Sequence, residues 1–235
     1  MPAIKKPVSK PASVSPTAPL GDPESPSRIY GGESREDRHL RRREQFLDAG
    51  LELIGREGYR AASVRALCRQ AKLTDRYFYE SFETVEDVLI GVYLRENERL
   101  RATVLAAIPP IQPGVTVGEF ARPALHAFFE VARTPLVARV LWFEVLGVSD
   151  RVNRIYRDNI ASYGQMLMMI VRSLYKMRQL SPAQEELLAM SIVGGISQTT
   201  MAWIVSDFSM PIEDLVDVTT LILEGIVLRL DLKVE

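Results

Sequence analysis

The segment LTDRYFYESF, residues 73–82, mixes aromatic rings with charged and hydroxyl-bearing side chains. An arginine can donate two hydrogen bonds to a guanine edge, and an aspartate can accept one from cytosine or orient an arginine. Threonine and tyrosine hydroxyls can reach phosphate oxygens, which position a protein on DNA without reading its sequence. These residue types predict contact with a DNA duplex through Thr74, Asp75, Arg76, Tyr77 and Tyr79.

Two short helices are needed to position these side chains. Ser63 is a good N-cap, and the apolar residues after it recur at i, i+3, i+4 and i+7, which makes one stripe. A three-residue turn leads to Thr74, the expected N-cap of the second helix. These dimensions are typical of a helix-turn-helix, which inserts the leading side chains of its second helix into the major groove. Leu73, Phe78 and Phe82 are expected to pack back on the preceding helices.

A basic run, RHLRRR at residues 38–43, opens the helix expected at about 38–56. Such a run can track phosphates or enter the minor groove with salt-dependent affinity, and we expect Arg41 and Arg42 to do so. A solvated helix start is the alternative interpretation of any arginine run. The adjacent helix-turn-helix favours the interaction with DNA.

The remaining sequence is patterned as helix, without an alternating strand pattern of useful length. Residues 1–33 hold half of the fourteen prolines and few large apolar side chains, so they are expected to form a disordered arm. The helix-turn-helix domain is expected over 34–83 and a larger helical domain over 84–235, which gives an all-α fold. Its helices are predicted at 84–107, 116–132, 135–147, 150–178, 181–206 and 211–230.

Composition limits the class of protein. One cysteine excludes an internal disulfide framework and a cysteine-based zinc site, and a formal net charge of −1 argues against non-specific coating of nucleic acid. The N-terminal segment lacks the apolar run of a secretory signal, and the window LLAMSIVGGISQTTMAWIV is broken by polar residues. We expect a cytoplasmic, nucleoid-associated protein without a membrane span, a cofactor or a metal ion.

The segment FLDAGLELIGREGYRAASVRALCRQAKLTDRYFYESFETVEDVLIGVY, residues 46–93, resembles the N-terminal domain of the tetracycline-repressor (TetR) family of bacterial transcriptional regulators. The resemblance implies an all-helical homodimer that binds a palindromic operator. Helices four to seven would form a domain for a small, largely apolar effector, and the last two helices would pair between subunits.

The resemblance also implies roles for individual residues. Ser63 and Arg65 occupy positions where contacts to the DNA backbone are common, and residues 74–77 occupy the recognition positions. Tyr79 takes the place of the usual phosphate-binding tyrosine. The family often has lysine and glycine where residues 75–76 are Asp and Arg, so its base preference does not carry over. The family often has a lysine at the position of Val85, so the resemblance does not imply a phosphate contact at this position.

The second domain offers candidate residues for an apolar effector pocket, because such sites combine apolar walls with a few polar groups. The candidates are Tyr93, Phe128, Phe129, Trp142, Phe143, Tyr163, Met166 and Met169. Packing in the hydrophobic core is the alternative interpretation for each aromatic residue or methionine.

Glu144 could bind a ligand as a polar anchor, but an ion pair with Arg139 is the favoured interpretation. His126 is interpreted as an ordinary helix histidine, and Cys68 as a packing residue rather than a redox sensor.

Gly194 and Gly195 would permit a close approach between helices, which predicts a four-helix interface between subunits. The residues expected there are Gly194, Gly195, Gln198, Met201, Ala202, Val205, Leu215, Val218 and Ile222. Packing within one subunit is the alternative.

Two other classes of protein fit the sequence less well. An enzyme is disfavoured because the chain has only two histidines, no glycine-rich phosphate loop, and its sole cysteine on a packing stripe. A helical adaptor that binds protein would leave outward-facing Arg76, Tyr77 and Tyr79 without a purpose.

Overall fold

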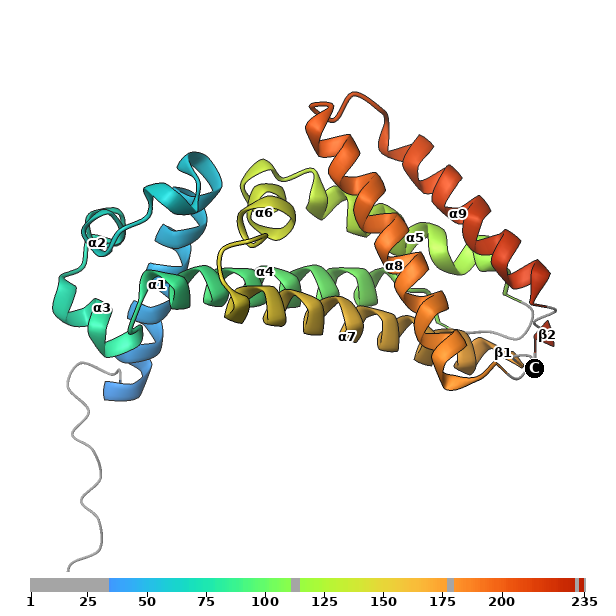
Figure 1. The fold of residues 1–235 in the computed structure, drawn as a ribbon, viewed down its shortest axis with the longest axis horizontal. Helices are drawn as coiled ribbons and strands as arrows, with labels where there is room; N and C mark the ends of the chain where they lie inside the picture. Colours follow the sequence, from blue (N-terminus) through green and yellow to red (C-terminus); the bar gives the residue numbers. More distant parts are fainter. Residues whose placement is uncertain (1–33, 111–114, 177–179, 231–232, 235) are drawn as a thin grey trace, which may run out of the picture. The chain divides into compact units, whose positions relative to one another are not determined.

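The computed structural model describes residues 34–110, 115–176, 180–230 and 233–234, and nearly all of them are helical (Figure 1). The N-terminal helices are α1 (Arg35–Glu57), the 3-10 helix η1 (Tyr59–Ala61), α2 (Val64–Ala71) and α3 (Asp75–Ser81). The others are α4 (Val85–Ala107), α5 (Val117–Ala132), α6 (Pro135–Arg139), the π-helical turn η2 (Val140–Glu144), α7 (Asp150–Leu174), α8 (Pro182–Val205) and α9 (Ile212–Arg229). The expectation of an all-α fold is confirmed.

The predicted arm over 1–33 lies outside the described residues, and the division between 34–83 and 84–235 stays a prediction. Residues 35–38 form the start of α1, and Ser34 directly precedes it. There the Asp37 N–H donates to the Ser34 hydroxyl over 3.0 Å, and the Ser34 N–H donates to the Asp37 carboxylate over 3.2 Å. These hydrogen bonds from Ser34 lower the pKa of Asp37.

Helix starts and stops follow from local chemistry. The Ala66 N–H donates to the Ser63 hydroxyl over 3.2 Å, which confirms the cap of α2. Thr84 and Asp87 exchange backbone-to-side-chain bonds of 2.8 and 3.1 Å, the capping box that opens α4. Lys72 adopts φ of 56° and ends α2 in the left-handed region. The helix-turn-helix boundaries could therefore be predicted to within about a residue.

Two segments differ from the prediction. The helix expected over 135–147 is α6 followed by η2, because five of its residues form a wide π-turn. The helix expected over 150–178 ends at Leu174, where strand β1 (Tyr175–Lys176) pairs antiparallel with β2 (Lys233–Val234). That pairing joins distant parts of the chain, so the local helical pattern does not reveal it.

The helix-turn-helix is held together by an aromatic cluster. Phe46 of α1 meets Phe78 edge-on, with ring centroids 5.5 Å apart, and also meets Phe82 at 6.2 Å. Phe78 is fully buried and Phe82 nearly so, and Leu73 packs against the same core. The predicted bracing of α3 from behind is confirmed.

Helix α1 is fixed to α4 by a close approach and by charge. A Cβ at Gly50 would lie 2.7 Å from the Val88 side chain, so this position requires glycine. Arg95 of α4 donates to Glu44 and Asp48 of α1 over 3.0 and 2.8 Å. These contacts hold α1 against α4.

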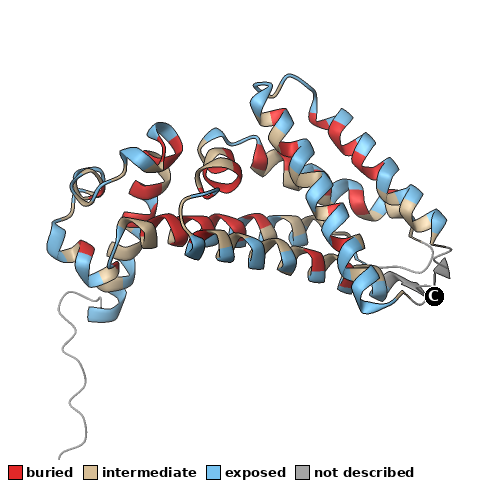
Figure 2. Ribbon diagram, viewed as in Figure 1, coloured by how far each residue is buried: buried red, intermediate tan, exposed pale blue. Residues whose placement is uncertain are grey.

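The second helical domain packs α4 on α5, α5 on α9, and α7 on α8. Helices α4 and α7 also lie side by side (Figure 1), and side-chain hydrogen bonds join them. Figure 2 shows buried residues along α4, whereas α8 and α9 expose much of their surface.

Candidate DNA-binding surface and effector cavity

Helix α3 presents its polar side chains to solvent. Thr74, Asp75, Arg76 and Tyr79 are exposed, the tyrosine with 62% of its surface accessible, while Phe78 on the opposite face is fully buried. The expected orientation is therefore present in the structure. Contact of these residues with DNA stays a prediction.

Glu80 organises the arginines around this helix, although the sequence pattern did not mark it as part of the site. Its carboxylate accepts from Arg76 Nε over 3.1 Å and from Arg42 over 3.3 Å. Its backbone carbonyl lies 2.9 Å from the His39 ring nitrogen. The spacing of Arg76 and Glu80, one helical turn apart, is the signal that could have found the first of these pairs.

Tyr77 is a partial correction, because it does not project freely. The Arg42 guanidinium lies 4.0 Å above the centre of its ring, and the tyrosine is half-buried. Cation–π attraction explains the stacking. Arg42 and Tyr77 therefore stabilise each other at the edge of the surface, and residues 74–76 and Tyr79 are the exposed side chains among the predicted contacts of this segment.

The other predicted DNA contacts lie on α1 and α2. Arg41 and Arg65 are exposed, and Ser63 is exposed at the N-terminus of α2. The Ser63 oxygen accepts the capping bond from Ala66, which does not use its hydroxyl proton. That proton is available for a phosphate oxygen.

A polar bridge connects the end of α1 with the domain behind it. Arg139 Nε donates to Glu144 over 2.8 Å, the pair that the sequence favoured, and Arg139 also donates to the Arg56 carbonyl over 2.7 Å. Glu144 accepts the Tyr59 backbone N–H over 2.7 Å. Gly58 adopts φ of 90°, and a Cβ at this position would lie 2.9 Å from the Arg139 guanidinium, so a glycine permits this close approach. Glu144 is thus a connector rather than a pocket anchor.

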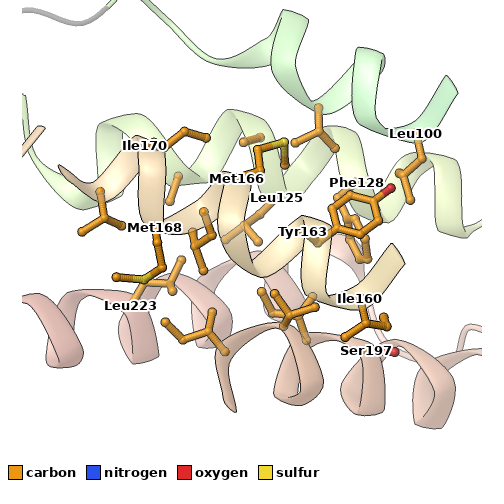
Figure 3. Close-up of a pocket in the computed structure, with 18 of the residues that line it drawn as sticks. Leu100, Leu125, Phe128, Ile160, Tyr163, Met166, Met168, Ile170, Ser197 and Leu223 are labelled. Atoms are coloured by element: carbon orange, nitrogen blue, oxygen red, sulfur yellow. The ribbon is translucent and has the colours of Figure 1, made fainter. Parts of the chain in front are cut away.

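A cavity of about 230 Å³ lies among α4, α5, α7, α8 and α9 (Figure 3). Five of the predicted pocket residues line it: Tyr93, Phe128, Trp142, Tyr163 and Met166. Most other lining residues are aliphatic, among them Leu100, Ile160 and Leu223. The lining has the composition of a site for an apolar molecule.

Three predicted pocket residues do not line this cavity. Phe129 is fully buried and meets Trp203 edge-on at 5.9 Å, so it is a core residue. Met169 is 71% exposed because Met166 and Ile170 occupy the inward face of α7. Phe143 is half-buried and packs on the core from η2.

Three polar lining residues, Asn97, Asn159 and Ser197, were not predicted from the sequence. The Asn159 amide donates to Asn97 Oδ1 over 2.9 Å and to the Tyr93 hydroxyl over 3.1 Å. The Tyr163 hydroxyl donates to the Asn97 carbonyl over 3.1 Å. Burial raises the pKa of both Tyr93 and Tyr163, so both phenols remain protonated at neutral pH.

Comparison with known proteins identifies the N-terminal domain. Residues 46–92 match the family described as bacterial regulatory proteins, tetR family, and these residues run from α1 through the helix-turn-helix into α4. The tetR-family match covers this N-terminal domain and not the rest of the chain. No curated protein matches the chain.

Solved structures of tetR-family and other regulators share the fold. The fatty acid degradation regulator FadR from Bacillus halodurans is 18% identical, with a TM-score of 0.64 over 78% of this chain and 95% of that chain. A TetR-like regulator from Rhodococcus sp. RHA1 is 18% identical, with a TM-score of 0.57 over 76% and 91%. FadR from Bacillus subtilis, solved with stearoyl-CoA, is 18% identical, with a TM-score of 0.57 over 75% and 95%.

Most of the residues predicted to form an interface between subunits lie on the surface of the structure. Val205, Val218 and Ile222 are 75%, 57% and 56% exposed, and a Cβ at Gly194 or Gly195 would meet no atom within 4 Å. Gln198 and Ala202 are also exposed, and Met201 is half-buried.

Leu215 is a correction. It is only 4% exposed and belongs to the core with Ile212 and Val216, because α9 packs one face on α5. The exposed apolar residues that the prediction missed on α8 and α9 are Leu187, Met190, Leu221 and Leu228. We call the exposed apolar residues of α8 and α9 the α8–α9 face.

Helix α8 is, among the described residues, the one helix long and apolar enough to cross a bilayer by length and composition alone. Core helices of soluble proteins also have this length and composition, so α8 alone is weak evidence for a membrane span.

Among residues 34–110, 115–176 and 180–230, no group of three or more His, Cys, Asp or Glu side chains could hold a metal ion. Burial raises the pKa of the Cys68 thiol, which lowers its reactivity.

Proposed function

We propose that this protein is a sequence-specific, DNA-binding transcriptional regulator that acts in the cytoplasm as a homodimer and responds to a small, largely apolar effector. The observation that carries the proposal is the two-sided α3, with Phe78 buried behind it and Arg76 and Tyr79 exposed in front. Fold similarity and the tetR-family domain support the same function. Neither an adaptor nor an enzyme accounts for this exposed polar side of α3.

A competition experiment tests the proposal. A duplex retained by the protein from genomic fragments should resist an excess of unrelated duplex, because specific sites are bound about a thousand-fold or more tighter than random DNA. Equal competition by both duplexes would argue for non-specific binding or none.

Two copies of α3 must reach successive major grooves on one side of the duplex. Half-sites that are one turn apart require a separation of roughly 34 Å between recognition helices. A homodimer with two-fold symmetry supplies this geometry and explains a palindromic operator. The α8–α9 face is the surface that we assign to dimer formation.

The variant Ile222→Asp is expected to dissociate the dimer. It places a charge without a partner in the interface, which costs roughly 3–5 kcal/mol. Sedimentation velocity should show a monomer at concentrations where the wild type is dimeric, together with weaker operator binding. Leu146→Asp is the matched control, because Leu146 is 44% exposed on a loop outside the α8–α9 face. A dimeric Ile222→Asp protein would refute this assignment.

The cavity is the site that we propose for the effector. Its lining is almost wholly apolar, and the similar fold of FadR from Bacillus subtilis was solved with stearoyl-CoA. An effector changes DNA affinity only if it binds the two arrangements of the DNA-binding domains with different affinity. Leu141 and Trp142 of η2 line the cavity, and Glu144 in the same turn holds the end of α1 through Tyr59. We propose that this bridge transmits the effector signal.

Arg139→Ala is expected to uncouple the two sites. A coupling of about 1–3 kcal/mol corresponds to a 5- to 150-fold effect of the effector on operator affinity, and most of it should disappear in the variant. Binding of the effector itself should change little, because Arg139 does not line the cavity. Operator titrations with and without effector measure the coupling.

Arg122→Ala is the control for this variant, since it removes an exposed ion pair between α5 and Asp217 of α9, outside the bridge. Full coupling in Arg139→Ala would show that the signal travels by another route.

A further inference from the structure

The cavity is elongated. Along α4 its lining runs from Tyr93 through Asn97, Leu100 and Val104 to Ile108, the C-cap of the helix. At a rise of 1.5 Å per residue this stripe is about 22 Å long. On α7 the lining extends over a similar stretch, from Tyr156 to Val171. A long, narrow molecule fits such a cavity better than a compact one.

The polar groups that α4 and α7 contribute gather at one end of the stripe. Tyr93 and Asn97 stand at its start on α4, and Asn159 and Tyr163 face them from α7. Figure 3 shows the Tyr163 hydroxyl near Leu100 and Phe128, away from Met168 and Ile170. A molecule lying along the cavity would therefore meet hydrogen-bonding groups at one of its ends.

One donor in this cluster is available to such a molecule. Asn159 uses both amide protons, one toward Asn97 and one toward the Tyr93 oxygen. Tyr93 accepts that bond, which does not use its own phenolic proton. Because burial raises the pKa of Tyr93, the proton stays in place at neutral pH. The Tyr93 hydroxyl can therefore donate to an oxygen atom of a bound molecule.

The described lining residues include no charged side chain. The nearby Arg101 guanidinium lies 5.0 Å from the centre of the Tyr163 ring, but Arg101 is not among the lining residues. Moving an ionised carboxylate into an apolar site without a counter-charge is costly, whereas a neutral oxygen needs only one or two hydrogen bonds. The cavity therefore disfavours a charged head group.

We propose that the effector is a long-chain lipid with one uncharged, oxygen-containing head group, such as an ester, thioester or alcohol, which accepts a hydrogen bond from Tyr93. This inference rests on the proposed function and specifies its effector. The head group lies at the Tyr93 end of the cavity, and the hydrocarbon chain extends toward Ile108 and Val171.

Binding to the full-length protein tests the inference directly. Trp142 lines the cavity and reports occupancy by fluorescence, while Trp203 lies outside the lining. The probes are methyl palmitate, 1-hexadecanol, palmitoyl-CoA and palmitate, at pH 8. Methyl palmitate and 1-hexadecanol should bind at least about ten-fold more tightly than ionised palmitate. Palmitate that binds as tightly as the neutral probes would overturn the proposal.

Tyr93→Phe removes only the hydroxyl and should weaken methyl palmitate binding by roughly 2- to 13-fold. Met169→Ala, on the exposed side of α7, should have no effect. Equal affinities of wild type and Tyr93→Phe for every neutral probe would overturn the assignment of the head-group position. Palmitoyl-CoA has an uncharged thioester but charged phosphates beyond it. Its tight binding would identify a thioester head with the phosphates outside the apolar cavity, and its failure to bind where methyl palmitate and 1-hexadecanol bind would identify an unconjugated lipid. Both outcomes support the proposal.

Failure of all four probes would overturn the inference. Operator binding is measured on the same preparation without any lipid. A protein that binds its operator but none of the probes would keep the proposed regulator function and lose only this effector class.

Discussion

The double variant Arg76→Ala/Tyr79→Ala should lose operator binding and keep its fold. A bidentate arginine contact contributes about 1–3 kcal/mol of base discrimination. A hydroxyl bonded to a phosphate adds roughly 1 kcal/mol. In a dimer each loss occurs twice, so binding should fall by at least about a hundred-fold. Both side chains are exposed, so circular dichroism and sedimentation should remain those of the wild type.

Arg133→Ala is the matched control for the arginine. Like Arg76, it belongs to an exposed ion pair within one helix, in this case with Glu130. Such pairs contribute little to stability, so neither substitution should unfold the protein. Unchanged operator affinity in the double variant would favour the adaptor interpretation over the regulator.

Phe78→Ala should destabilise the helix-turn-helix strongly. Phe78 is fully buried and contacts Phe46 and Phe82 at centroid distances of 5.5 and 5.9 Å. Truncating a buried phenylalanine to alanine costs about 3–5 kcal/mol, because apolar contacts are lost and a cavity remains. Urea denaturation measures the change in the free energy of unfolding.

Tyr79→Ala provides the comparison, because Tyr79 is the next residue along α3 and is 62% exposed. It should lower the free energy of unfolding by less than about 1 kcal/mol. If both variants lost equal stability, the buried aromatic face would not be what holds α3 in place.

The sequence predicted the helix-turn-helix well, since its signals are local. The Ser63 cap and the Thr84–Asp87 capping box set helix boundaries through atoms at most three residues apart. The alternation of Phe78 and Tyr79 between buried and exposed sides follows from helical periodicity. The pairing of Arg139 with Glu144 was also predicted, from two residues close in the chain.

The second domain was less predictable because its features depend on how helices are rotated against one another. A hydrophobic pattern marks Met166, Met169 and Leu215 equally as apolar, yet only packing decides that the first lines the cavity, the second faces solvent and the third enters the core. Asn97 and Asn159 meet from helices far apart in sequence. No local pattern indicates that these amides form the polar end of a cavity.

Selection of bound duplexes from a random DNA pool tests the proposed function most directly, because the pool contains every candidate operator half-site. If two copies of α3 read DNA from one dimer, the recovered sequences should converge on an inverted repeat. Its half-sites should be centred roughly 10 base pairs, or a multiple of one turn, apart. Recovery of no common sequence, or of a single motif without two-fold symmetry, would contradict a dimeric, sequence-reading regulator.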